Sequence, residues 1–349
     1  MTNISSSAVV AEAGGPLVPE GLPTEPQKAK PAWRSLNFGP RMWISLGLIG
    51  FVAALAFIGP LFYPFGPEEK VGSLYDQPTW MNTPPTFEHI LGTENFGYDV
   101  LAVLMASARN SIIIGLLAGT IAVVIGVAIG VIAGYVGGWV EELLMGFTNI
   151  VLAIPSIVIL ILISISLQST GVPFLKGVVG LALVIGVTSW PWTARAVRAQ
   201  ASSVATREHI DVAKLSGART PSIMVRDVLP YLASYAVMAW VLQLASAILA
   251  ESTLSMLGLG PAGANSLGKQ LFWALAFQAV ATGAWWAFLP PTIVLTMISF
   301  GLLYLQSSLD EVFNPRLRRG KKKNLAKAAA RREETARKLA ENPPVEVNA

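Results

Sequence analysis

Long stretches without a charged residue dominate the chain. Six of them can each hold a membrane-crossing helix, which needs about 20 mostly apolar residues. These windows cover residues 42–67, 110–140, 143–175, 177–194, 228–250 and 270–309. The last window has twice the length that one crossing needs, so we expect a re-entrant or interfacial segment over 271–284 and the sixth span over 286–308. The pattern predicts an all-α polytopic membrane protein with six transmembrane helices.

Composition supports this prediction and excludes much chemistry. Of the 349 residues, 53% are hydrophobic and 13% are charged, whereas an average soluble domain has about 25% charged residues. The mean hydropathy is +0.56. The chain has no cysteine and only two histidines, His89 and His209, which excludes disulfides, a thiol nucleophile and cysteine-based zinc or iron–sulfur sites. We therefore expect no metal site and no catalytic residue.

Basic residues form three clusters, and these predict the orientation. Of the 25 lysines and arginines, 11 lie within 316–338, six within 195–226 and four within 28–41. Because basic residues stay on the cytoplasmic side, the clusters place both termini in the cytoplasm. A nucleic-acid-binding protein can also carry basic clusters, but its core is not this apolar, so we expect no nucleic-acid partner.

These patterns divide the chain into five parts. Residues 1–41 form a cytoplasmic N-terminal tail, expected to be disordered, and 42–63 form the first span. An external loop over 64–100 precedes a core over 101–312, which holds five more spans and a cytoplasmic loop at 199–230. Residues 313–349 form a basic cytoplasmic tail. We interpret this tail as solvated, with attachment to anionic membrane lipid as the alternative.

Within the spans, small residues and prolines stand out. Glycines recur in the second window, mostly four residues apart, at 115, 119, 126, 130, 134 and 138. Such a stripe lets another helix approach closely; a substrate path along it is the alternative. Pro155 and Pro191 predict kinks or helix ends in the next two windows.

Charged residues within the spans are the usual mark of ion-coupled carriers. Here the candidates Arg109, Glu141, Glu142 and Glu251 fall near the predicted ends of spans. Ion coupling is therefore disfavoured, and we expect the energy for any transport to enter from outside the bilayer.

One segment resembles a phosphate-binding loop. Residues 263–270 nearly match GxxxxGK[ST], but Gln270 occupies the position that needs a hydroxyl for Mg²⁺. The segment also falls on the predicted external face. We expect no nucleotide binding by this chain.

The cytoplasmic loop at 199–230 is the most informative segment. Its pattern predicts a short helix over 207–217, with Ile210 and Ala213 on one face and Gly217 as its end, since Pro221 prevents a simple continuation. Held between two spans and docked into a partner's cleft, such a helix could work as a lever. An ordinary linker helix is the alternative.

Several motifs together resemble one family, the ATP-binding-cassette importer permeases of the oligopeptide and dipeptide (peptide/nickel) type. Asp211-Val-Ala213, Gly217 and Leu229-Pro230 are similar to the family's EAA loop. The resemblance covers residues 40–318 and continues in order through further segments, at 89–101, 133–139, 153–156, 251–260, 285–286 and 309–317. Asp211, Val212, Tyr98 and Asn149 stand where the family usually has Glu, Ala, Arg and Asp.

The resemblance implies the fold of a type I importer permease and a set of partners. These are a second, homologous permease subunit, two cytosolic ATP-binding subunits that carry ATP and Mg, an external substrate-binding protein and membrane lipid. It also implies that the loop transmits ATPase closure to the spans. The residues that it assigns to this coupling are Arg207, Glu208, Asp211, Ala213, Leu215, Gly217, Leu229 and Pro230.

The expected function is therefore peptide import without covalent chemistry on this chain. Oligosaccharide or nickel remain alternative substrates, because no residue of the sequence separates these options and substrate-binding residues cannot be assigned. An ATP-independent secondary carrier or channel, a membrane-embedded enzyme and a non-transporting scaffold are the alternatives from other classes. Transport that survives ATP depletion would identify the carrier.

Overall fold

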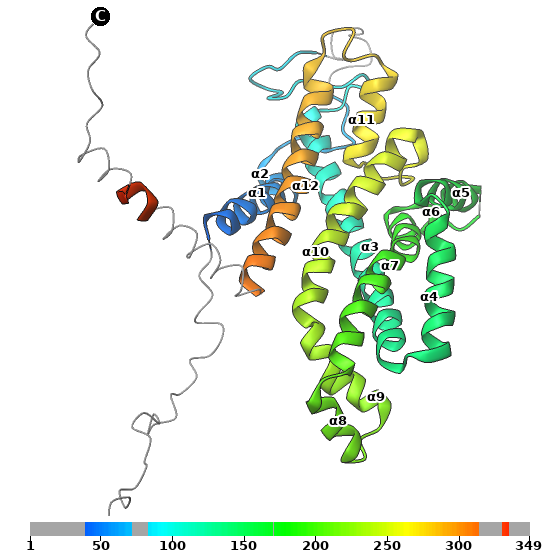
Figure 1. Cartoon of the computed structure of the whole chain (residues 1–349). Coiled ribbons are helices and arrows are strands. Elements are labelled where there is room, and N and C mark those ends of the chain that lie inside the picture. Colours follow the sequence, from blue (N-terminus) through cyan, green and yellow to red (C-terminus); the bar gives the residue numbers. More distant parts are fainter. Residues whose placement is uncertain (1–38, 72–82, 170, 314–329, 335–349) are drawn as a thin grey trace, which may run out of the picture. The chain divides into compact units, whose positions relative to one another are not determined.

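The computed structural model describes residues 39–71, 83–169, 171–313 and 330–334 (Figure 1). The predicted tails, 1–41 and 313–349, lie almost entirely outside these residues. The main elements are α1 (Pro40–Phe57), α2 (Gly59–Phe62), α3 (Val100–Val136), α4 (Gly138–Ala153), α5 (Ser156–Ser169), α6 (Pro173–Lys176), α7 (Val178–Ala205), α8 (Glu208–Leu215), α9 (Thr220–Ile223), η2 (Met224–Val228), α10 (Leu229–Leu254), η3 (Ser255–Leu259), α11 (Leu267–Ala276) and α12 (Trp285–Phe313).

The all-α polytopic fold is confirmed. Within the described residues five helical segments are long and apolar enough to cross a membrane, Pro40–Phe57, Val100–Val136, Val178–Ala205, Thr220–Met256 and Trp285–Phe313. The second begins ten residues before the predicted window, and so places Arg109 inside α3. The third, α7, extends past the fourth predicted window (177–194) to Ala205. The expected short segment after 270 is α11, whose ten residues are too few to span.

The third predicted span is not one straight helix. Its window is divided between α4 and α5, which meet at an angle of 82° and make a sixth span only if counted together. Ile154, between them, has an extended backbone (φ −90°, ψ 130°), because the ring of Pro155 disfavours helical geometry in the residue before it. Pro191 does not end its helix, since α7 continues through it.

Helix α3 lies at the centre, packed along α7 and α10. The glycine stripe explains how closely they approach. A methyl group on Gly130 would lie 2.6 Å from the carbonyl oxygen of Ala194 in α7, and one on Gly134 would lie 2.5 Å from that of Arg198. Nearer the other end, a methyl group on Gly115 would lie 2.4 Å from Cγ1 of Ile248 in α10. The predicted close approach is confirmed for the glycines from 115 to 134, which pack against α7 or α10, whereas Gly138 lies at the start of α4 with no atom within 4 Å of a Cβ.

This packing leads to a stability prediction. Gly130→Leu should push α3 and α7 apart, since even a Cβ would overlap backbone atoms; overpacking a tight contact costs about 1–3 kcal/mol or more. We expect a lower melting temperature and a lower yield of monodisperse protein. Gly50→Leu is the matched control, because no atom lies within 4 Å of a Cβ at that position in α1. Equal melting temperatures for the two variants would contradict this account of the stripe.

The helices have two ends, which we name by the elements found there. In Figure 1 α8 and α9 lie at the lower end, the α8 end, and α11 lies at the upper end, the α11 end. At the α11 end Asp99 caps α3: its Oδ1 accepts from the amide of Ala102 at 2.9 Å, and its Oδ2 lies 2.8 Å from Nδ1 of His89. This carboxylate fixes the segment 83–99 to the start of α3.

A second carboxylate is buried between helices at the same end. Glu251 of α10 is completely buried. It accepts hydrogen bonds from the hydroxyls of Ser111 in α3 (2.9 Å) and Ser255 in η3 (2.6 Å). The Ser111 hydroxyl in turn accepts from the amide of Leu267, at the start of α11, at 3.1 Å. One carboxylate and its serines therefore connect α3, α10 and α11.

At the α8 end, α10 is preceded by a wider helical turn. The amide of Leu229 donates to the carbonyl of Met224, five residues earlier, instead of four. The turn joins α9 to α10 without interrupting the helical path, so α9, η2 and α10 form one continuous segment.

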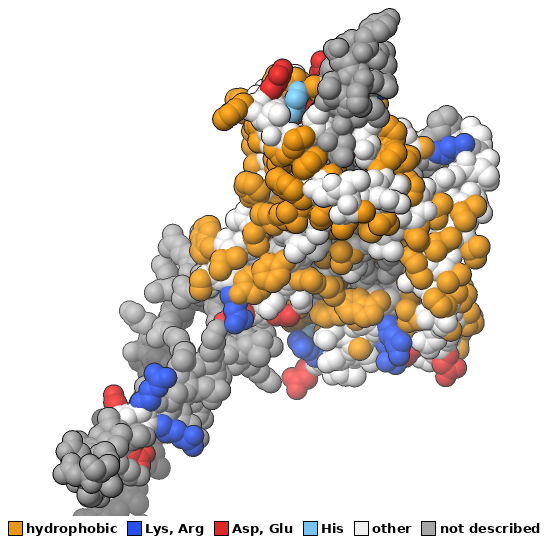
Figure 2. All heavy atoms as spheres, turned by 90° about the horizontal axis from the view of Figure 1, so that it is seen from above, with side chains coloured by type: hydrophobic (Ala, Val, Ile, Leu, Met, Phe, Trp, Pro, Cys, Tyr) orange, Lys and Arg blue, Asp and Glu red, His pale blue; other side chains and the backbone are white. Residues whose placement is uncertain are grey.

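The outer surface is strongly apolar. Figure 2 looks onto the α11 end and shows hydrophobic side chains over much of the visible face, with charged ones mostly toward its edges. Exposed apolar side chains on the long helices include Val124 (62%), Leu143 (62%) and Ile150 (65%). Such contiguous apolar surface fits contact with lipid or with other membrane helices.

Candidate functional site

The loop between α7 and α10 forms a helical hairpin at the α8 end (Figure 1). Helix α7 ends at Ala205, later than predicted, so the connection is shorter than the expected loop. It consists of α8 (Glu208–Leu215) and α9 (Thr220–Ile223). Arg207 is the residue before α8, and Glu208 and Asp211 lie in its first turn, where negative charge favours the helix dipole.

Gly217 ends α8, as the sequence predicted. Its φ is +78°, a left-handed conformation that costs a residue with a side chain about 1–2 kcal/mol. The amide of Gly217 donates to the carbonyl of Lys214 at 3.0 Å, and that of Ala218 donates to Ala213 at 3.2 Å. This pair of bonds is the Schellman motif, which closes a helix and turns the chain sharply.

One face of α8 is anchored to the long helices. Ile210 is completely buried in a cluster with Val131 of α3, Val204 of α7 and Leu232 of α10, and Ala213 packs against it. Two cations rest over tyrosine rings, Arg207 over Tyr231 at 5.4 Å and Lys214 over Tyr135 at 6.0 Å. This face of α8 is therefore in contact with residues of α3, α7 and α10.

The opposite face of α8 is exposed in the part of the chain that the structure describes. Leu215 is 88% exposed and Val212 is 65% exposed, beside the exposed Glu208 and Asp211. The Asp211 carboxylate lies 3.3 Å from the Lys214 ammonium, a solvent-exposed pair that adds little stability. This face of α8 therefore presents two exposed apolar side chains beside acidic ones.

The structure brings most of the predicted loop residues together. Arg207, Glu208, Asp211, Leu215 and Gly217 are exposed around α8. Leu229 packs against the buried cluster instead, and Pro230 is exposed in the first turn of α10. Their roles in coupling stay a prediction.

Two features of this end were missed by the sequence reasoning. The exposure of Val212 was not foreseen, although it falls on the face opposite Ile210 at helical spacing. An ion pair between Arg198 of α7 and Glu141 of α4 joins the start of α4 to the end of α7, just before the hairpin. Nothing in the sequence marks these two residues as partners, since they belong to different predicted spans.

Other candidate chemistry finds little support in the described residues. They contain no group of three or more His, Cys, Asp or Glu side chains placed to hold a metal ion. The segment that resembles a phosphate-binding loop begins α11 instead: Ser266 caps that helix by accepting from the amide of Lys269 at 3.2 Å. The chain before it is a turn through Gly263 rather than a strand.

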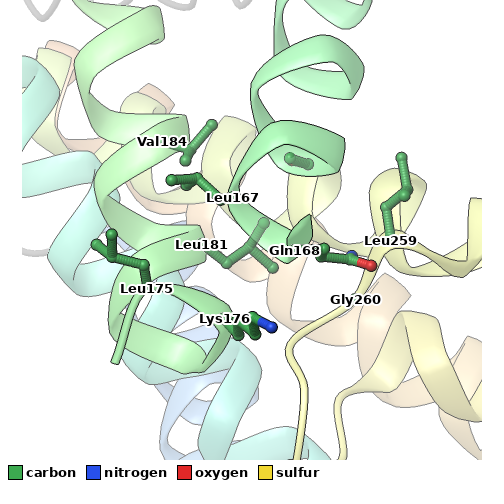
Figure 3. Close-up of a pocket in the computed structure, with 9 residues that line it drawn as sticks. Leu167, Gln168, Leu175, Lys176, Leu181, Val184, Leu259 and Gly260 are labelled. Carbon is green, nitrogen blue, oxygen red and sulfur yellow. The ribbon is translucent and has the colours of Figure 1, made fainter. Parts of the chain in front are cut away.

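A small pocket lies between α5, α6, α7 and η3 (Figure 3). Four leucines and Val184 form its apolar lining, and Gln168 and Lys176 are the longer polar side chains. Its volume is about 10 Å³, which is the space of roughly one water molecule. It is too small for a substrate.

Comparisons with known proteins decide the family. Residues 126–319, more than half of the chain, match the family described as binding-protein-dependent transport system inner membrane component. The chain belongs to this family. The match includes the end of α3 from residue 126, the α8 hairpin and all later helices to α12, so the hairpin belongs to the family's own domain.

Relatives of this inner-membrane component extend the match toward the N-terminus. The chain is 31% identical over 289 residues to the dipeptide transport system permease protein DppC of Bacillus subtilis (82% of this chain, 86% of the relative). It is 33% identical over 234 residues to the oligopeptide transport system permease protein OppC of Lactococcus lactis subsp. cremoris (67% and 77%). The protein is thus a multi-pass cell-membrane component of a binding-protein-dependent transport system.

Proposed function

We propose that the chain is a permease subunit of an ATP-driven importer of peptides. The observation that carries this proposal is the α8 hairpin, with Ile210 anchored among three long helices and Leu215 exposed on the other face. The names of the two relatives support peptides as the substrate, since they are dipeptide and oligopeptide permeases. No covalent chemistry on this chain is required.

In this proposal α8 is the contact through which partner motion reaches the membrane. A second permease subunit completes the pathway, and two cytosolic subunits bind ATP and Mg and supply the energy. An external substrate-binding protein delivers the peptide at the α11 end. ATP-driven closure of the cytosolic subunits displaces α8, and the buried cluster around Ile210 transmits the displacement to α3, α7 and α10.

Purification and uptake measurements test the proposal together. The tagged chain, extracted in mild detergent, should bring with it a homologous permease and two ATPase chains, identified by mass. Asp211→Lys and Gly217→Val should reduce ATPase recovery and lower peptide uptake at least tenfold. The spans should remain folded, because both residues are exposed and the cost of a left-handed valine is about 1–2 kcal/mol.

The control is Glu88→Lys, a charge reversal at an exposed site of the α11 end, which should leave ATPase recovery unchanged. Wild-type uptake in both α8 variants would refute the lever assignment. A chain that purifies alone and moves peptide in liposomes without ATP would instead identify a secondary carrier.

A further inference from the structure

A larger pocket at the α11 end is lined by charged, polar and aromatic side chains. It lies between the segment before α3, the first turns of α3 and α11, with a volume of about 240 Å³. Small-molecule sites usually measure about 300–1,000 Å³. The pocket lies just below this range, which suits a small organic ligand and is too small for a long peptide.

Two opposite charges enter this pocket from different elements. Glu94 belongs to the segment before α3, and Lys269 belongs to α11. Within the described residues they form no direct ion pair with each other, although each influences the other's ionisation. The Lys269 ammonium donates to the carbonyl of Ala264 at 2.9 Å, which leaves two of its three N–H groups for another acceptor.

Burial leaves the Glu94 carboxylate poorly compensated. Desolvation raises its pKa to about 7, against a smaller opposing effect of Lys269. A ligand cation at this position would replace the lost hydration and favour the ionised form. The carboxylate thus gains more from a bound ammonium group than an exposed carboxylate would.

Uncharged polar groups in the pocket also lack partners. Gln270 is 5% exposed and Ser107 is completely buried. Among the described residues neither amide atom of Gln270 nor the Ser107 hydroxyl has a hydrogen-bond partner. An unpaired buried polar group costs about 1–3 kcal/mol. Groups kept unpaired at that cost, on the wall of a pocket, are available to a polar ligand.

Aromatic rings form the apolar part of the wall. Phe96 and Trp273 meet edge to face, with ring centroids 4.9 Å apart, and Val103 lies beside them. The pocket therefore offers an anion, a cation, an amide, a hydroxyl and an apolar surface within one small volume. A ligand that satisfies all of them carries an ammonium group, a carboxylate and a peptide-like polar centre.

We propose that this pocket binds a dipeptide-sized zwitterion, with Glu94 accepting hydrogen bonds from its ammonium group and Lys269 donating to its carboxylate. Gln270 and Ser107 bond the peptide unit between the two charges. The choice of a peptide rests on the proposed function. A neutral oligosaccharide would use neither charge, and a nickel ion would be repelled by Lys269.

Calorimetric titration of the purified full-length chain tests this with three probes. These are alanylalanine, its N-acetylated form without the ammonium group, and its C-terminal amide without the carboxylate. Alanylalanine should bind, and each blocked form should bind at least tenfold more weakly. Lys269→Gln should remove the preference for the free carboxylate, and Glu94→Gln should remove the preference for the free ammonium group.

Two controls separate binding from folding. Lys176→Gln is the control for Lys269→Gln and Glu88→Gln is the control for Glu94→Gln, because each removes a charge of the same sign at the α11 end but outside this pocket. Both control variants should keep both preferences. Gln270→Met, close in volume, should raise the melting temperature because it removes an unpaired buried amide, while weakening alanylalanine binding several-fold. A residue with only a structural role would not move the two readouts in opposite directions.

The proposal that this pocket binds a dipeptide would be wrong if alanylalanine did not bind, or if the blocked forms bound with equal affinity. Peptide uptake by the complete importer is the separate readout for the proposed function. Wild-type uptake without alanylalanine binding would contradict the proposed binding pocket and leave the proposed importer function standing. Binding with the expected preferences, in a complex that imports no peptide, would support the binding pocket and contradict the importer function.

Discussion

Replacing Glu251 with leucine is expected to cost more stability than any other substitution considered for this protein. The carboxylate is completely buried and accepts from the hydroxyls of Ser111 and Ser255. Leucine would leave both hydroxyls without an acceptor inside the protein. Each buried hydroxyl left without a partner costs about 1–3 kcal/mol, so the loss of both bonds takes a large share of the 5–15 kcal/mol that stabilises a typical fold.

We expect Glu251→Leu to yield little monodisperse protein and a strongly lowered melting temperature. Glu251→Gln should be milder, because its amide oxygen still accepts from one serine while the shape is kept. The control is Glu142→Leu, which removes an exposed carboxylate of α4 and should change stability by at most about 0.5 kcal/mol. If Glu251→Leu behaved like this control, the network around Glu251 would not hold α3, α10 and α11 together.

Replacing Leu215 with aspartate is expected to abolish transport while leaving the fold intact. Its side chain is 88% exposed at the end of α8, so aspartate costs the isolated chain almost nothing. In the assembled importer a partner is proposed to cover this face. An apolar anchor at the centre of an interface contributes about 2 kcal/mol or more, which corresponds to about thirtyfold in affinity.

The measurement compares uptake, ATPase recovery and melting temperature in one set of samples. Leu215→Asp should lose uptake and ATPase subunits at an unchanged melting temperature. Leu215→Met is the conservative control, since methionine fills a similar apolar volume, and it should retain both. Full uptake by Leu215→Asp would show that α8 meets its partner through a different face.

The features that could be predicted from the sequence depend on residues close together in the chain. Hydrophobic windows gave the long helices, and the helical spacing of Ile210 and Ala213 gave the anchored face of α8. Gly217 and Pro221 marked its end for a local reason, the left-handed conformation that glycine adopts easily. The glycine stripe of α3 likewise predicted a closely packed neighbouring helix, because small residues at four-residue spacing in a membrane helix usually lie at a helix–helix contact.

Features that need distant residues could not be predicted. Ser111 and Glu251 are 140 positions apart, and only the packing of α3 on α10 brings them into contact. Glu251 was expected near a span end, where a carboxylate normally meets water, yet the protein surrounds it with serines. Pro155 predicted that the helix would be interrupted, but not the angle of 82° between α4 and α5, because a proline restricts its own backbone and not the direction of the following helix. Glu94 and Lys269 gave no signal of a shared pocket.

The wider turn before α10 has a consequence for comparing members of this family. A residue in an α-helix advances the chain by about 100° around the helix axis, and the bond from Leu229 to Met224 accommodates one residue more than an α-helical turn would. Removing that residue would rotate α9, which directly precedes the turn, by about 100° relative to α10. A single-residue gap within 224–228 would therefore mean a hairpin that leaves α10 in a different direction, and a differently aimed docking surface, rather than a shorter loop.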